Sequence, residues 1–217
     1  MNIKVHTPKS LKAGSGIASL KQFLLSLVAT TVSIVLTFGT AAIIENNKKE
    51  KEKREIVMML MYDMQETLTS LQECDSALTR FIDVQIDVMA NPETFEEKEL
   101  LLAACVPFFE YTQTVEHIFN SNVETINTIG NVLFVENVSE FYNLRSHCNE
   151  MVIKPFQEKS DKFLKSYDDL VESGATTTKP IIHSFLHRMQ LMFDECKEMM
   201  KVTDEDLENF STERSKL

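Results

Sequence analysis

The sequence has few of the residues that end helices and turn chains. Its 217 residues include only five glycines and five prolines. Sandwiches and barrels need many tight turns, so this scarcity argues against both, while the plentiful Leu, Met, Glu and Lys favour helix. The one strand-like run, VLFV at 132–135, is too short to build a sheet. We therefore expect an all-α fold.

Cysteines are also few, and none forms a Cys-x-x-Cys pair or another metal-ligand spacing. The four are Cys74, Cys105, Cys148 and Cys196. Two interpretations stay open. They are small buried apolar residues, or they form two disulfides in a domain that is exported.

Charge is missing altogether from residues 23–44, FLLSLVATTVSIVLTFGTAAII. A helix of this length spans roughly 33 Å, which matches a hydrocarbon core of roughly 30 Å. A cleavable signal has a shorter apolar region of about 7–15 residues. Gly39-Thr40-Ala41 could serve as a cleavage site, but the apolar run continues beyond it through Ile44. We expect an uncleaved membrane-spanning helix, with a cleaved signal as the alternative.

Small hydroxyl side chains recur along this segment with 4-3-4-3 spacing, which places them on one helix face. They are Ser26, Thr30, Ser33, Thr37 and Thr40. In lipid, such residues let helices approach closely and share hydrogen bonds, so this face is a candidate surface for membrane association with a second copy or a partner helix. The alternative is that each hydroxyl bonds to a carbonyl of its own helix.

Acidic residues are absent from residues 1–44, so all 33 lie beyond them together with 18 of the 22 basic residues. Nucleic-acid binding depends on Lys and Arg that neutralise phosphates, so this acidic region argues against it. The basic residues on the two sides of residues 23–44 are nearly equal in number, which leaves the topology open by the positive-inside rule. We expect residues 1–22 inside and the remainder outside. In the opposite topology, the KKEKEKR stretch would face anionic lipid headgroups.

Four parts follow from these patterns: a basic N-terminal tail at 1–22, the membrane-spanning helix at 23–44, a helical bundle at 45–202, and a short C-terminal helix and tail at 203–217. Residues 45–90 contain neither Gly nor Pro, and their apolar positions follow a near-heptad stripe. The span is therefore expected to continue into this amphipathic helix and to stop at Asn91-Pro92.

The rest of the bundle should be helical in several pieces. We expect a short helix that ends before Pro107, and a helix at 107–121 with Phe108, Tyr111, Val115, Ile118 and Phe119 buried. A further short helix should be closed by Gly130 in a left-handed conformation.

The C-terminal half should begin with a long helix from about 137, kinked at Pro155. Residues 173–179 read as a flexible loop and Pro180 as the start of the last main helix. A capping box is expected at Thr203 and Asp206. The resulting fold is an antiparallel helical bundle whose first helix continues from the membrane.

No pattern in the sequence identifies catalysis, a cofactor or a metal. His183, His187 and Asp194 share a helix face, but the Glu that accompanies paired histidines in metalloproteases is absent. His147 and Cys148 are adjacent and so point about 100° apart on a helix, which keeps them from pairing as base and nucleophile. Clustered methionines at 58, 59, 61 and 64 are typical of ordinary packing, the alternative being a groove that binds helices.

Two stretches carry a family resemblance: KKEKEKREIVMMLMYDMQETL after the apolar segment, and VETINTIGNVLFVENVSEFYN in the middle of the chain. With the basic tail and single span, they resemble a bacterial family of small single-pass membrane proteins of unknown function, over about residues 18–165. The positions that match its turn and following helix are Thr125, Ile129, Gly130, Val132 or Leu133, Val135, Phe141 and Tyr142. The segment lacks the Trp and Asn often seen at the end of that family's anchor, which Glu45-Asn46-Asn47 match only in part. The resemblance implies architecture and a location in the bacterial inner membrane, without an activity.

The sequence thus favours a single-pass membrane protein, not an enzyme, whose bundle serves structure or protein interaction at the membrane surface. Its expected partners are the lipid bilayer and a second copy or another membrane protein. The alternative is a membrane-anchored sensor or ligand-binding bundle that acts through a separate partner.

Overall fold

The computed structural model describes residues 15–121 and 123–215, and every regular element among them is helical. Helix α1 is one continuous helix over Ser15–Ala90, as the absence of Gly and Pro after residue 44 predicts. It ends at Ala90, and Asn91 leaves the helical conformation (φ −134°, ψ 72°) just before Pro92, which disfavours a helical residue ahead of it. The chain divides into two units, Met1–Lys51 and Glu52–Leu217; the second is called the bundle below.

The described part of the first unit is the N-terminal portion of α1, and its described apolar side chains are exposed. Thr31 Oγ1 donates a hydrogen bond to the Leu27 carbonyl at 2.8 Å, the local bonding open to a hydroxyl in a helix. No helix within residues 15–121 and 123–215 is both long and apolar enough to cross a membrane. The membrane span at 23–44 stays a prediction.

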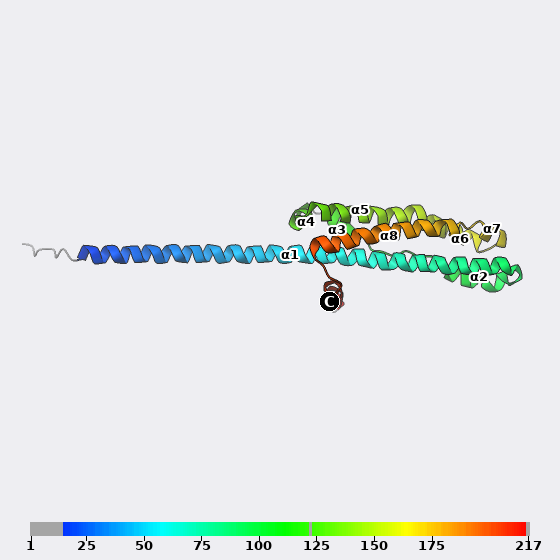
Figure 1. Cartoon of the computed structure of the whole chain (residues 1–217), viewed down its shortest axis with the longest axis horizontal. Coiled ribbons are helices and arrows are strands. Elements are labelled where there is room, and N and C mark those ends of the chain that lie inside the picture. The colour runs from blue at the N-terminus through cyan, green and yellow to red at the C-terminus, as the bar shows by residue number, and fades with distance from the viewer. Residues whose placement is uncertain (1–14, 122, 216–217) are drawn as a thin grey trace, which may run out of the picture. The chain divides into compact units, whose positions relative to one another are not determined.

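The bundle runs up, down, up and down (Figure 1). A 3₁₀ turn at Pro92–Thr94 and α2 (Phe95–Ala104) reverse the chain after α1, and α3 (Thr114–Ser121) and α4 (Val123–Ile129) follow on the way back. Helix α5 (Val132–Cys148), a π-helical turn at Asn149–Ile153, α6 (Lys154–Phe163) and α7 (Tyr167–Val171) then run beside α1. Helices α8 (Ala175–Met200) and α9 (Asp204–Arg214) complete the chain. The expected all-α helical bundle is confirmed.

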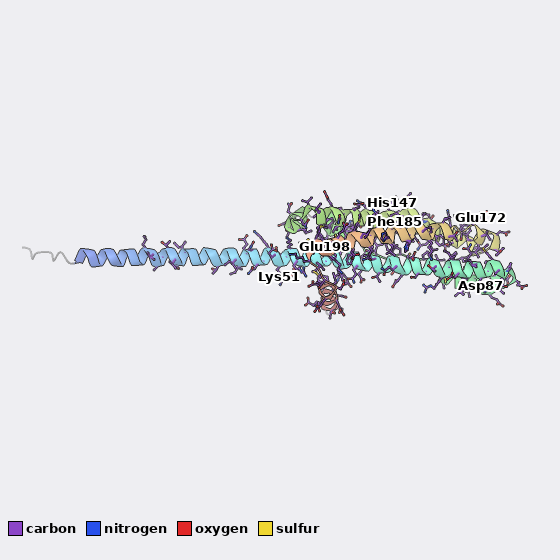
Figure 2. The ribbon with its side chains drawn as sticks, in the orientation of Figure 1. Lys51, Asp87, His147, Glu172, Phe185 and Glu198 are labelled. Atoms are coloured by element: carbon purple, nitrogen blue, oxygen red, sulfur yellow. The ribbon has the colours of Figure 1, made fainter. Side chains whose placement is uncertain are left out.

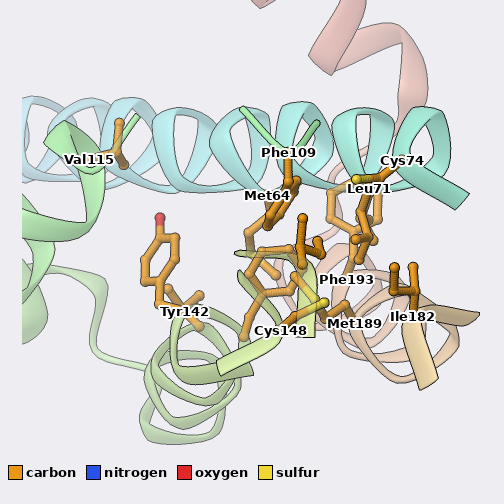
Figure 3. Packing of buried hydrophobic residues seen from close by; sticks show 14 of the residues in the cluster. Met64, Leu71, Cys74, Phe109, Val115, Tyr142, Cys148, Ile182, Met189 and Phe193 are labelled. Carbon is orange, nitrogen blue, oxygen red and sulfur yellow. The ribbon is translucent and has the colours of Figure 1, made fainter. Parts of the chain in front are cut away.

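Apolar side chains from every pass meet in one core (Figure 3). Met61, Met64 and Leu71 of α1 are fully buried, and Met189 and Cys196 of α8 lie in the same core. The methionines at 58, 59, 61 and 64 are therefore packing residues, as their spacing indicated. Burying such side chains contributes about 1.5–3 kcal/mol each, which is what holds the passes together.

Pro155 disrupts α5–α6 without ending the helical path. It has no N–H to donate, and the turn before it widens into a π-helix in which the Lys154 N–H reaches the Asn149 carbonyl. The expected kink at Pro155 thus takes the form of a π-helical turn. This turn places Asn149 and Glu150 on the side that faces α1.

Two of the expected local structures are wrong. Residues 107–113 are not helical, because their backbone is held by side chains of other helices: Gln157 Nε2 donates to the Pro107 carbonyl at 2.7 Å, and the Glu110 N–H donates to Ser70 Oγ at 3.1 Å. As a result Phe108 is 65% exposed and Phe109 is buried in its place. Ile118, also expected inside, is 42% exposed.

The expected loop at 173–179 is the second correction. Only residues 172–174 separate α7 from α8, since α7 ends at Val171 and α8 starts at Ala175 and contains Pro180 in its second turn. Gly174 adopts φ +72° and supplies the turn, and Ala175, the first residue of α8, is buried. The predictions for Gly130 (φ +64°) and for the Thr203–Asp206 capping box are confirmed.

Candidate functional site

The predicted membrane-association face lies on the first unit. Thr30, Ser33 and Thr40 are exposed there. The side chains of Ser26 and Thr37 lie outside the described residues. The face therefore stays a prediction, with three of its members on the surface of α1.

The three residues considered as metal ligands do not form a metal site in the described part of the chain. His183, His187 and Asp194 are all exposed on α8, and Asp194 accepts a hydrogen bond from Gln190 Nε2 at 3.1 Å. Within the described residues, no group of three or more His, Cys, Asp or Glu side chains could hold a metal ion.

The four cysteines are buried, and none is bonded to another. Burial raises the pKa of Cys74, Cys148 and Cys196 to about 12 in each case. His147, beside Cys148, is exposed and lies against the Phe185 ring at 5.8 Å (Figure 2). These three thiols are packing residues, held in the protonated form that is inert as a nucleophile.

A buried arginine is the most unusual feature of the bundle. Arg145 of α5 is 0% exposed, although arginine is rarely buried without partners. Its Nη1 donates to Asp63 Oδ2 at 3.0 Å and to Thr67 Oγ1 at 3.1 Å, and its Nη2 donates to Glu116 Oε2 at 2.7 Å. Three passes of the chain therefore meet at one guanidinium.

Two tyrosine rings lie close to this guanidinium. Arg145 Cζ lies 4.4 Å from the ring centre of Tyr111 and 4.5 Å from that of Tyr142. A planar guanidinium stacks well on aromatic rings, an arrangement that lysine could not reproduce. We call Arg145, Asp63, Thr67, Glu116, Tyr111 and Tyr142 the arginine centre.

Local structure positions each member of the arginine centre. Asp63 and Thr67 are one helical turn apart on α1, so both point to the same side. Glu116 lies in the first turn of α3, and Tyr111 comes from the non-helical segment that precedes it. The irregular backbone at 107–113 is thus what brings Tyr111 onto the guanidinium.

Burial governs the ionisation of the arginine centre. Burial raises the pKa of Asp63, and the neighbouring Arg145 opposes this effect. Burial likewise raises the pKa of Tyr142, and the Asp63 carboxylate adds to the effect, so this phenol stays protonated. Its hydroxyl points toward α1 (Figure 3).

A cavity of about 1150 Å³ adjoins the arginine centre. Asp63, Thr67 and Tyr111 are members of the arginine centre and also line the cavity. One side of the arginine centre therefore forms the cavity floor. The remaining walls come from α1, the 108–115 segment, the π-helical turn, α6 and α9. They are Tyr62, Glu66, Thr69, Ser70, Glu73, Phe108, Phe109, Glu110, Thr112, Gln113, Val115, Asn149, Glu150, Lys154 and Arg214. We call this space the acidic cavity.

Sequence reasoning missed the arginine centre, although a signal was present. Arg145 lies on the same helical stripe as Phe141 and Cys148, and Asp63 lies between Met61 and Met64 on α1. A charged residue inside an apolar stripe calls for a buried partner of opposite charge. What the sequence did not reveal is that these two stripes face each other.

No family model, no curated protein and no solved structure matches the chain. The arginine centre and its cavity are therefore interpreted from their own geometry.

Proposed function

We propose that this chain is a single-pass membrane protein whose bundle acts by binding at the membrane surface, in a structural or protein-interaction role and without catalysis. The observation that carries the proposal is the continuity of α1, in which the uncharged residues 23–44 and the first helix of the bundle belong to one helix. An uncharged stretch of 22 residues within a helix is long enough to serve as a membrane anchor. The resemblance to the bacterial family of small single-pass membrane proteins supports the same architecture, and the basic tail at residues 1–22 favours a bundle outside the inner membrane.

Membrane extraction tests the anchor. Full-length chain should remain in the membrane pellet after alkaline carbonate treatment. Replacing Val28 and Val32 together by Arg should release it, because each central charge costs about 2.5–3.5 kcal/mol of insertion free energy. The matched control replaces exposed Leu100 and Leu101 of α2 by Arg, outside residues 23–44. Release of the unaltered chain by carbonate would overturn the proposal.

Self-association through the hydroxyl face forms part of this proposal. Small residues at 4-3-4-3 spacing allow close helix approach, so replacing Thr30 and Thr37 by Leu should weaken crosslinking between copies in the membrane. Replacing Thr31 by Leu, one position off this face, serves as the control. Equal crosslinking of all three proteins would place the interface elsewhere or exclude a homo-oligomer.

The acidic cavity favours a second candidate function, a membrane-anchored bundle that binds a small ligand and acts through a separate partner. Ligand pockets usually measure about 300–1,000 Å³ and present a few fixed polar groups. This cavity, at about 1150 Å³, is slightly larger than that range and has the buried polar residues Asp63 and Thr67 in its lining. A thermal-shift screen of small charged and neutral compounds tests ligand binding, since a ligand that binds only the folded state raises Tm.

A further inference from the structure

Two large apolar side chains are exposed next to each other at the start of α5. Val132 and Leu133 are 72% and 64% exposed, whereas the next residue, Phe134, is fully buried. The Phe134 N–H donates to Asn131 Oδ1 at 3.2 Å, which caps the helix and fixes its first turn. An ordered helix start thus presents two apolar side chains outside the core. We call Val132 and Leu133 the apolar pair.

Contacts within the bundle place the apolar pair at one end of it. Asn131 Nδ2 lies 3.8 Å from Met200 Sδ, so the start of α5 lies beside the end of α8. Helix α9 follows after three residues, and its Asp206 pairs with Arg54 of α1 at 2.9 Å. Arg54 is close to Glu52, where the bundle begins. We call this the entry end, and Figure 1 shows α4 and the end of α8 together there.

The chain itself tethers the entry end to residues 23–44. Ile56, which packs against the core, follows Ile44 by 12 positions. This interval measures about 18 Å as a helix and at most about 43 Å when fully extended. The opposite end of the bundle is farther along α1, because Asp87, which pairs with Lys98 of α2, lies roughly 45 Å beyond Ile56. If residues 23–44 span a bilayer, the entry end is the part of the bundle held beside it.

Charges near the entry end do not oppose contact with lipid headgroups. Two of the three acids in the first turn of α9 form ion pairs with cations of α8 and α1, namely Asp204 with Lys197 and Asp206 with Arg54. The third acid, Glu205, is balanced in number by the exposed Lys201. These six side chains carry no net charge, so they neither repel nor require an anionic lipid.

A bilayer surface suits the apolar pair better than a second bundle does. Two side chains in one helical turn offer far less area than the roughly 800 Å² per partner of a stable protein interface. Apolar side chains can instead enter the boundary between headgroups and acyl chains. Because a tether raises the local concentration of the surface, a small contact is sufficient there.

We propose that Val132 and Leu133 insert into the interface of the bilayer that residues 23–44 span, so that the entry end of the bundle rests on lipid. This inference rests on the proposed function, a membrane anchor at residues 23–44, and adds the surface through which the bundle meets the membrane. It holds for either topology, because the tether is the same on both sides. Helix α2, at the opposite end, stays clear of lipid.

Single tryptophans test the proposal, because the chain has none of its own. Leu133→Trp reports on the entry end, and Leu100→Trp, at a position 83% exposed on α2, is the matched control. Each full-length variant is reconstituted into phosphatidylcholine vesicles, with and without bromine on the acyl chains near the headgroups. Bromine quenches only a tryptophan that it contacts.

We expect brominated lipid to reduce the emission of Leu133→Trp and to leave that of Leu100→Trp unchanged. Leu133→Trp should also emit at the shorter wavelength, since its ring leaves water. Both positions are exposed, so circular dichroism of each variant should match that of the unaltered chain.

The contrary outcomes separate this inference from the anchor on which it rests. If the chain resists carbonate extraction but neither tryptophan is quenched, the anchor stands and the proposed contact is wrong. Equal quenching of both would mean that the bundle lies along the bilayer, which also overturns contact through the entry end. Short-wavelength emission from Leu133→Trp without quenching would show that protein covers it. Release of the unaltered chain by carbonate overturns both proposals.

Discussion

Arg145 Nη1 donates to Asp63 Oδ2 at 3.0 Å, and this contact joins two helices across 82 positions of sequence. The ion pair fixes the register of α5 against α1, because sliding either helix by one turn would leave a buried charge without a partner. Burying charge is expensive, so such a pair contributes more to choosing one arrangement than to net stability. We infer that the arginine centre specifies how the passes of the bundle align.

Removing the guanidinium should destabilise the bundle strongly. Arg145→Ala leaves Asp63 and Glu116 facing each other without a cation and also opens a cavity between the two tyrosine rings. We expect a loss of about 3–5 kcal/mol in the free energy of unfolding, measured by urea denaturation of the full chain in detergent. As a control, Arg188→Ala breaks an exposed ion pair with Glu140 and should cost less than about 1 kcal/mol.

A combined variant separates unpaired charge from lost packing. Replacing Arg145 by Met together with Asp63→Asn and Glu116→Gln removes all three charges at once. Most of the stability lost in Arg145→Ala should return, because no charge is then buried alone. If the combined variant is as unstable as the single one, packing by the guanidinium and not its charge dominates.

The buried thiols should resist alkylation in the folded chain. With a pKa of about 12, Cys74, Cys148 and Cys196 carry roughly one thiolate in ten thousand molecules at pH near 8. A maleimide should therefore label the native chain slowly and the urea-unfolded chain fully. Gln72→Cys, exposed on α1, provides a reactive control in the same helix.

Labelling also tests whether the four cysteines are free thiols, as in the structure, or form two disulfides. If the protein forms two disulfides when exported, denatured chain will label only after reduction. Full labelling of unfolded chain without reductant supports four free thiols, whereas rapid labelling of the native chain would contradict their burial.

Acid should weaken the attachment of α9. Asp206 accepts hydrogen bonds from the backbone and hydroxyl of Thr203 and pairs with Arg54 at 2.9 Å, which lowers its pKa from about 3.8 to about 2. A carboxyl whose pKa is depressed by folding stabilises the folded state above its unfolded value. That contribution is lost as the pH falls from about 3.8 to about 2.

Asp206→Asn should therefore lower Tm at neutral pH, with a difference from the unaltered chain that shrinks below pH of about 3.8 and vanishes near 2. Circular dichroism melts across this range measure it. Glu208→Gln, an exposed neighbour outside the capping box, should leave the profile unchanged. A constant Asp206→Asn difference at every pH would show that the effect is not electrostatic.

Lys201 adopts a left-handed backbone (φ 52°, ψ 46°) at the end of α8. The Val202 N–H donates to the Lys197 carbonyl at 2.9 Å and the Lys201 N–H to the Glu198 carbonyl at 3.3 Å, the two bonds of a Schellman motif. Since this conformation strains any residue with a Cβ, Lys201→Gly should raise the free energy of unfolding by about 0.5–1 kcal/mol.

A glycine placed inside the helix should instead lower the free energy of unfolding. Lys179→Gly lies within α8 and should cost about 1 kcal/mol in the same urea titration. Destabilisation by both substitutions would mean that the side chain of Lys201 stabilises the helix end by more than its backbone strain costs.

The helices with strong local signals were predictable. The long α1 and its end at Asn91-Pro92, the turn at Gly130 and the Thr203–Asp206 capping box each depend on interactions within a few residues. Residues 107–113 were misjudged for the opposite reason. Their backbone bonds to Ser70 and Gln157, which are distant in sequence, and these bonds replace those of a helix.

The sequence by itself determined that this protein is helical, where its apolar stripes lie, and that residues 23–44 form an uncharged stretch separate from an acidic region. The tertiary structure decided that the stripes carrying Asp63 and Arg145 face each other, that Tyr111 stacks on the guanidinium, and that an acidic cavity opens beside them. Periodicity specifies which side of a helix is apolar. The partner of each side depends on how distant segments pack, because a buried charge is satisfied only by the group that the whole fold brings to it.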